Sequence, residues 1–170
     1  MIELSAAEFS EYLIHDGILD ILKDRNRMQI TDRPANERYS KHVKAVFQVG
    51  EERTDSFKVV LGYPVEFVLL DNPYSRNTGD RIRVRFLRNE QPVAGQLVYA
   101  SYDGWEESRD THDAREAVRT FTDADGVAHI TLSAAGRWYI RTIFMLPTDE
   151  AGVDYISEWA TLTFEIRLNR

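Results

Sequence analysis

The stretch Ala160-Thr-Leu-Thr-Phe-Glu-Ile-Arg-Leu168 alternates apolar and polar side chains along its whole length. Successive side chains of a β-strand point to opposite faces of the sheet, whereas a helix would need apolar residues three and four positions apart. The residues expected on the buried face are Ala160, Leu162, Phe164, Ile166 and Leu168. This stretch therefore predicts the last strand of a sheet that covers a hydrophobic core.

The same two-residue period recurs in shorter segments upstream. Ile82, Val84 and Phe86 alternate with three arginines, which predicts a half-buried strand. Turn-forming residues separate such segments at intervals of about 8 to 12 residues, which is typical of a sandwich. From Phe57 to Leu168 we therefore expect a mainly β fold, an immunoglobulin-like (transthyretin-like) antiparallel sandwich of about seven strands. Asp123-Ala-Asp-Gly126 predicts the turn of a β-hairpin within it.

The residues before this region begin with a helical pattern instead of the two-residue period. Ser5 and Glu8 form a Ser-x-x-Glu capping box that predicts a helix, and the polar run after Leu22 should end the helical pattern. Alternation from Tyr39 to Val49 predicts a strand with Val43 and Phe47 on its apolar face. We therefore expect residues 1–52 to form a helix and an extra strand, and residues 53–170 to form the sandwich.

Composition excludes several classes of function. The chain has 21 Lys and Arg against 28 Asp and Glu, and its net charge of −7 argues against nucleic acid as a partner. It has no cysteine, which excludes disulfides, thiolate metal sites and cysteine nucleophiles. No apolar run approaches the roughly 18 residues of a spanning helix, so the chain is not expected to cross a membrane. The residues after Met1 do not resemble a secretory signal, so no signal peptide is expected in this chain.

The candidate site lies in the long polar connection from Tyr102 to Arg115. Loops at the end of a sandwich commonly carry binding surfaces, and this one combines aromatic, histidine and carboxylate side chains. The candidate ligand-binding residues are Tyr102, Trp105, Asp110, His112 and Asp113. Trp138, by contrast, is expected in the core. Solvated loop positions are the alternative for all of the polar candidates.

His112 is also the candidate metal ligand. Asp110 and Asp113 could supply oxygen donors beside it. The four histidines of the chain show no His-x-His or His-x-x-x-His spacing, so a transition-metal site would need residues from distant parts of the chain. Beyond that metal, no cofactor is expected.

Catalytic signatures are missing from the sequence. There is no Gly-x-Ser-x-Gly nucleophile elbow, no phosphate-binding loop and no dinucleotide glycine fingerprint. The carboxylates are plentiful, but no spacing pairs them for acid–base work. We therefore expect that the protein is not an enzyme.

A family resemblance is carried by motifs in a fixed order along most of the chain. They are Leu61-Gly62-Tyr-Pro64-Val-Glu66, Asn72-Pro73-Tyr74, Gly79-Asp80, Gln91-Pro92-Val-Ala-Gly95, Thr122-Asp-Ala-Asp-Gly126 and Gly136-Arg-Trp138, preceded by Glu8-Phe9, Tyr12-Leu13, Gly17-Ile18 and Glu37-Arg38-Tyr39-Ser40. Together they resemble a domain-of-unknown-function family of bacterial exported proteins once described as NikM-like nickel-uptake proteins.

The resemblance implies a location and a set of functions. It implies a periplasmic or exported protein in which residues 1–52 are the remnant of a preceding domain. Three functions stay open: a non-catalytic module that binds an unknown protein or small ligand, a metal-binding accessory of nickel or cobalt uptake, and a structural envelope domain. Because the Tyr39–Val49 strand needs a partner, it should pair with the sandwich or with another chain, and a homodimer is one expectation.

Overall fold

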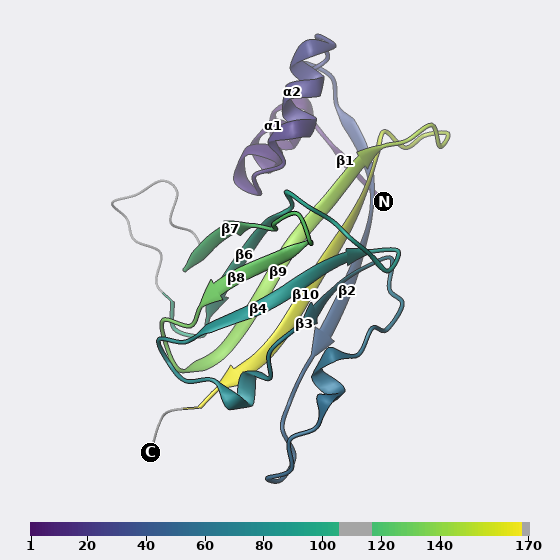
Figure 1. Cartoon of the computed structure of the whole chain (residues 1–170). Coiled ribbons are helices and arrows are strands. Elements are labelled where there is room, and N and C mark those ends of the chain that lie inside the picture. The colour runs from purple at the N-terminus through teal and green to yellow at the C-terminus, as the bar shows by residue number, and fades with distance from the viewer. Residues whose placement is uncertain (106–116, 168–170) are drawn as a thin grey trace. The chain divides into compact units, whose positions relative to one another are not determined.

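The structure, a computed structural model, describes residues 1–105 and 117–167 (Figure 1). Within these ranges the chain is mainly β, as predicted, with ten strands in two sheets rather than about seven. The helices are α1 (Ala6–His15), α2 (Leu19–Arg27) and the short 3₁₀ helices η1 (Asp55–Lys58) and η2 (Pro73–Ser75). The strands are β1 (Ile2–Leu4), β2 (Ala35–Ala45), β3 (Val65–Leu69), β4 (Arg81–Arg88), β5 (Gln91–Pro92), β6 (Leu97–Tyr102), β7 (Val118–Phe121), β8 (Val127–Thr131), β9 (Gly136–Pro147) and β10 (Tyr155–Ile166).

Two sheets organise these strands. The larger has the order β1-β2-β10-β9-β6-β7, and the smaller has the order β3-β4-β5, with β8 paired to the other side of β4. The register pairs that define β3–β4, β4–β8 and β6–β9 are all antiparallel. Two antiparallel sheets with a shared apolar filling are consistent with the predicted sandwich.

The chain divides into two compact units. The first comprises residues 1–41 and 143–159, and the second comprises residues 42–142 and 160–170. The long strands β2, β9 and β10 therefore contribute residues to both units. The proposed origin of residues 1–52 as the remnant of another domain stays a prediction.

In the first unit, the capping box forms as predicted. The Ser5 backbone N–H donates to Glu8 Oε2 at 2.9 Å, and the Glu8 N–H donates to Ser5 Oγ at 3.4 Å. Helix α1 buries Phe9 and Leu13 against Tyr155 and its neighbours. Gly17, with φ +70, then allows the sharp turn into α2.

The polar run after Leu22 was expected to end the helical pattern, and α2 does end with this run, at Arg27. The run lies inside α2, and its Arg25 is almost fully buried. The Arg25 guanidinium donates to the Ile30 carbonyl at 2.8 Å and lies 5.0 Å from the centroid of the Phe9 ring. A charged side chain can therefore take a core position, because backbone oxygens and an aromatic face replace its water.

In the second unit, the predicted inward faces are confirmed where they are described. Ile82, Val84 and Phe86 are fully buried on β4, while Arg81 before them and Arg83 between the first two are exposed. The apolar set of β10 is also buried, namely Ala160, Leu162, Phe164 and Ile166, while Leu168 lies outside the described residues. These side chains fill the space between the β4 sheet and the β10 sheet.

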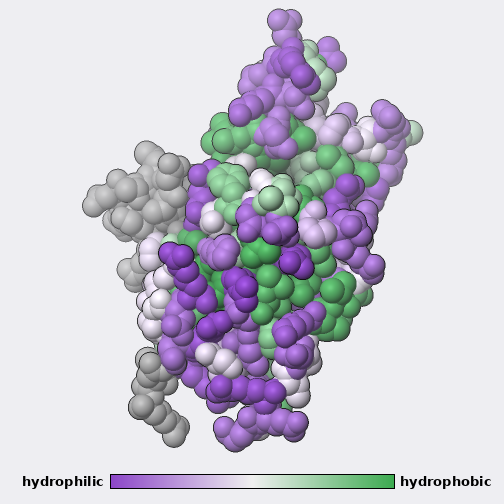
Figure 2. Space-filling model, viewed as in Figure 1, coloured by the Kyte–Doolittle hydropathy of each residue, from purple (hydrophilic) through white to green (hydrophobic). Residues whose placement is uncertain are grey.

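Strand β2 covers Ala35–Ala45 rather than the predicted Tyr39–Val49, and the face expected to be buried is exposed to solvent. Val43 and Phe47 were expected inside, but they are 59% and 76% exposed, while Lys44 between them is buried. Lys44 forms an ion pair with the buried Glu66 of β3, which holds it inside. The Val46 N–H donates to the Thr163 carbonyl at 2.9 Å, so this segment pairs within the chain. Figure 2 shows hydrophobic surface over β2 and β3, framed by hydrophilic residues.

The predicted hairpin around Asp123 is also wrong. Strand β7 pairs with β6 in the larger sheet, whereas β8 pairs with β4 in the smaller one. The turn therefore carries the chain from one layer of the sandwich to the other. Asp123 Oδ1 accepts the N–H groups of Asp125 and Val127 at 2.9 Å each, which fixes the turn. Sequence spacing showed a tight turn but could not show which sheet each arm would join.

Candidate functional site

The candidate site forms where β6 ends beside the start of β9. In the antiparallel register of these strands, Tyr102 lies opposite Trp138 and Ser101 lies opposite Tyr139. The Tyr102 and Trp138 ring centroids are 5.0 Å apart. The pairing of two strands that are distant in sequence thus collects aromatic rings at one end of the larger sheet.

A turn after β6 adds a third ring. The Asp103 N–H donates to the Arg137 carbonyl at 2.8 Å, and the Trp105 N–H donates to the Tyr102 carbonyl at 3.0 Å. Gly104 between them has φ +85, which favours glycine. This turn places the Trp105 ring edge-on to Tyr102, with centroids 5.8 Å apart and planes at 71°. Edge-to-face geometry is a preferred arrangement of aromatic pairs.

These side chains line an open hollow of about 580 Å³. Its walls combine aromatic rings, hydroxyl groups and one pair of opposite charges. The lining residues are Ser101, Tyr102, Asp103, Gly104, Trp105, Arg137, Trp138, Tyr139 and Thr163. All of them belong to the second compact unit. We call this feature the aromatic hollow.

The charged pair is at the solvent-exposed rim of the hollow. Arg137 Nη2 lies 2.6 Å from Asp103 Oδ2, and both side chains are more than half exposed. The hydrogen bond that Arg137 donates to Asp103 raises the pKa of Arg137 above its ordinary value. An exposed pair of this kind contributes less than about 1 kcal/mol, so a ligand can compete for either partner at little cost.

The two tryptophans of the hollow have different roles. Trp138 is buried, as predicted, and its indole N–H donates to the Ala134 carbonyl at 2.9 Å. The Trp105 indole N–H is shielded from solvent, yet it finds no acceptor among the described residues. A buried donor without a partner costs free energy, and an acceptor on a ligand would recover it.

The predicted site residues have different outcomes. Tyr102 and Trp105 lie together in the aromatic hollow. Asp110, His112 and Asp113 lie outside the described residues, so their ligand role and the metal role of His112 stay predictions. Within residues 1–105 and 117–167, no group of three or more His, Asp or Glu side chains could hold a metal ion.

Sequence reasoning did not place Arg137 at the site. Arg137 and its partner Asp103 are 34 positions apart, so no local motif joins them. The register between β6 and β9 is the signal that would have found them, because it follows once the two strands are known to pair.

The family described as Domain of unknown function (DUF4198) matches residues 7–145, which is most of the chain. The chain belongs to the DUF4198 family. Its resemblance to a domain-of-unknown-function family is thereby confirmed, while the nickel-uptake description stays a prediction. Searches among curated proteins and solved structures gave no significant match. No helix in the described part of this DUF4198 chain is long and apolar enough to cross a membrane.

Proposed function

We propose that this DUF4198 member is a non-catalytic binding module that acts outside the cytoplasm and holds a short oligosaccharide in the aromatic hollow. The observation that carries the proposal is the meeting of Tyr102, Trp105 and Tyr139 around one hollow with a polar rim. Sugar rings present C–H faces that pack on aromatic rings, and hydroxyl groups that bond charged and polar side chains.

The size and lining of the hollow support a small ligand. A volume of about 580 Å³ lies within the range of roughly 300 to 1,000 Å³ that is usual for such sites. Arg137 and Asp103 at the rim offer both donors and acceptors to hydroxyl groups. The indole N–H of Trp105, which finds no acceptor within residues 1–105 and 117–167, adds a donor that a sugar oxygen can satisfy.

The chemistry of the lining supports binding without catalysis. Among the described lining residues, Asp103 is the only carboxylate, and no histidine accompanies it. Cleavage of a glycosidic bond generally needs two carboxylates on either side of the bond. Asp103 already accepts a hydrogen bond from Arg137 at 2.6 Å, so the lining offers no second carboxylate to work with it.

The location outside the cytoplasm is carried by the family resemblance. We expect the native protein in the envelope or secreted fraction of its host, measured by immunoblotting of separated fractions beside a cytoplasmic marker. Recovery only with the cytoplasmic marker would contradict this part of the proposal.

Binding can be tested by titrating the protein with a panel of neutral and acidic oligosaccharides while tryptophan fluorescence is recorded. We expect saturable binding to at least one of them, and about tenfold weaker binding by Trp105→Ala, because a lost aromatic contact is worth about 1.4 kcal/mol. The matched control is Phe121→Ala, since Phe121 is an exposed aromatic residue on β7 outside the hollow. The proposal is wrong if no oligosaccharide binds, if Trp105→Ala binds as tightly as the native protein, or if a bound sugar is cleaved.

A further inference from the structure

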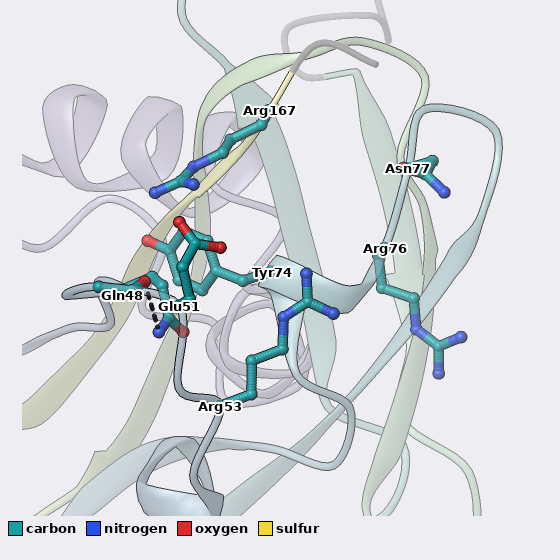
Figure 3. Close-up of a pocket in the computed structure, with 8 residues that line it drawn as sticks. Gln48, Glu51, Arg53, Tyr74, Arg76, Asn77 and Arg167 are labelled. Atoms are coloured by element: carbon teal, nitrogen blue, oxygen red, sulfur yellow. Dashed lines mark hydrogen bonds between the residues drawn. The ribbon is translucent and has the colours of Figure 1, made fainter. Parts of the chain in front are cut away.

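A second recess in the same compact unit has a different chemistry from the aromatic hollow. It is a cleft of about 160 Å³ formed by the segment after β2, the η2 turn and the residue that follows β10. Its lining is polar and includes three arginines. The lining residues are Gln48, Gly50, Glu51, Arg53, Tyr74, Arg76, Asn77 and Arg167 (Figure 3). We call it the arginine cleft.

The loop that carries Gly50, Glu51 and Arg53 is held in shape by Gln48. Its side-chain amide donates to the Gly50 carbonyl at 3.2 Å and to the Glu52 carbonyl at 2.6 Å. Gly50 has φ +67, so the loop can turn tightly there. Arg53 follows this turn, and its guanidinium donates to Ser75 Oγ at 3.1 Å. The loop and the η2 turn are thus tied together at the mouth of the cleft.

Arg76 shares its carboxylate partner, Asp71, with a second arginine. Its guanidinium lies 2.7 Å from Asp71 Oδ1, and Arg83 also donates two hydrogen bonds of 3.0 Å to the same carboxylate. Hydrogen bonds from Arg83 lower the pKa of Asp71 to about 2, so the carboxylate stays charged at neutral pH. Two arginines sharing one carboxylate leave an excess of positive charge on this wall of the cleft.

Arg53 and Arg167 have no carboxylate partner among the described residues. Arg167 lies with its guanidinium carbon 5.7 Å from the centroid of the Tyr74 ring. The Tyr74 hydroxyl donates to the Val46 carbonyl at 3.0 Å, which fixes the ring beneath Arg167. Figure 3 shows Arg167 above and Arg53 below the Tyr74 side chain, so the two guanidinium groups border the same space.

Glu51 points into this space without closing it. Figure 3 shows its side chain between Arg167 and Arg53, yet within the described part of the chain it forms no ion pair with either. Three arginines and one carboxylate thus line the cleft, in a protein whose net charge is −7. A local excess of positive charge in a protein of negative net charge favours an anionic ligand.

We propose that the arginine cleft binds a compact oxyanion group, held between the guanidinium groups of Arg53 and Arg167, with Glu51 moving aside as it enters. The planar fork of a guanidinium matches the oxygens of a carboxylate or a phosphate and forms paired, charge-assisted hydrogen bonds with them. Tyr74 keeps Arg167 in place by stacking, and Arg76 supports the positive wall through Asp71. A water molecule occupies about 30 Å³ in the liquid, so the cleft has room for a phosphate or carboxylate group.

The test is calorimetric titration of the whole chain with potassium phosphate and, separately, with sodium malonate, each at an ionic strength matched with potassium chloride. We expect saturable heat with at least one of the two anions. Binding of phosphate alone assigns the site to phosphoryl groups, binding of malonate alone assigns it to carboxylates, and binding of both assigns it to oxyanions in general. No saturable binding of either anion overturns the proposal.

Variants connect the heat to the cleft. Arg53→Ala and Arg167→Ala should each weaken binding about tenfold or more, because each removes a charge-assisted contact. Glu51→Gln should tighten binding severalfold, because it removes an internal competitor and a repulsive charge. The matched control is Arg119→Ala, which removes an exposed arginine of β7 outside the cleft and should bind as the native protein does.

Folding of each variant is verified by circular dichroism and thermal unfolding. If Arg53→Ala does not fold, Arg53→Lys keeps the positive charge but loses the fork, and it should still bind more weakly than the native protein. Equal affinity of Arg53→Lys, Arg167→Ala and Arg119→Ala, or weaker binding by Glu51→Gln, would refute the assignment.

Discussion

Replacing Lys44 with methionine tests whether the buried ion pair with Glu66 keeps the Lys44 side of β2 inside the second compact unit. The Lys44 ammonium donates to Glu66 Oε2 and, at 2.9 Å each, to the carbonyls of Val59 and Phe67. Both members of the ion pair are buried, with 6% and 2% of their side chains exposed. The methionine would fill a similar volume, but the Glu66 carboxylate and the two carbonyls would lose the hydrogen bonds that Lys44 donates.

The number of partners that Lys44 has sets the expected loss in the free energy of unfolding. Removing one member of a buried ion pair costs about 3 to 5 kcal/mol. Glu66 keeps the N–H groups of Leu61 and Gly62, which donate to it at 3.0 and 2.9 Å, so we expect the lower half of that range. Because a domain of this size is stable by roughly 5 to 15 kcal/mol, the change should be large in urea unfolding followed by fluorescence.

The same variant should change the response to acid. Burial pulls the pKa of Glu66 upward, but hydrogen bonds from Lys44 and from the Leu61 N–H outweigh it, so the pKa lies below its ordinary value. A lowered carboxyl pKa stabilises the fold above the unfolded pKa, and this stability is lost as the pH falls through the folded pKa. Without Lys44 the pKa of Glu66 should rise, and acid unfolding should begin at a higher pH.

The matched control is Lys58→Met. Lys58 is half exposed and lies 3.0 Å from Asp55, so its loss should cost less than about 1 kcal/mol. If Lys44→Met cost no more than Lys58→Met, or if its acid unfolding were unchanged, the buried pair would not be what keeps Lys44 inside.

Three further changes have expected outcomes. Gly126→Ala should destabilise the fold by about 2 kcal/mol or more in a urea titration, because Gly126 has φ +72 and a Cβ there would lie 2.9 Å from a neighbouring carbon and a backbone nitrogen. Gly95→Ala is the control, with φ +70 but open space around the new Cβ, and it should cost about 1 kcal/mol; equal losses would contradict the role of the contact. Burial raises the pKa of Glu37, so its contribution to stability is present below the unfolded pKa and is lost as the pH rises through the folded pKa. Melting temperatures of Glu37→Gln measured across that pH range should lack this decline, and a pH profile equal to that of the native protein would contradict the role of Glu37. Ser5→Ala should lower the free energy of unfolding by about 1 kcal/mol, because it removes the N-terminal cap of α1. Ser10→Ala, within the helix, should be close to neutral in the same thermal unfolding, and the reverse order would show that the cap is not stabilising.

The sequence predicted those parts of the fold where alternation and burial agree. Ile82, Val84 and Phe86 are apolar and buried, so their period of two indicated both the strand and its inner face. Strand β2 broke the rule because one buried ion pair, between Lys44 and a residue 22 positions away, decided its orientation. A polar residue that finds its partner far along the chain gives no local sign of burial.

The candidate sites show the same limit. Trp105 could be singled out because an aromatic residue in a polar loop is unusual, and it lies in the aromatic hollow. The arginine cleft had no comparable signal. Arg53, Tyr74 and Arg167 come from three separate segments, and only the closing of the sandwich brings them to one space. Sites assembled from distant segments follow from topology, which spacing alone does not determine.

The division of the first compact unit into two chain segments has a consequence for biosynthesis. Arg25 bonds Tyr155 across 130 positions, and Glu37 bonds Ser157 across 120. At about 5 to 20 residues per second, helices α1 and α2 emerge from the ribosome roughly ten seconds before the strand segments that complete their core. Throughout that interval Phe9 and Leu13 have no native core to enter. The nascent amino-terminal segment is therefore a natural substrate for a chaperone that shields apolar helices until residues 143–159 have been made.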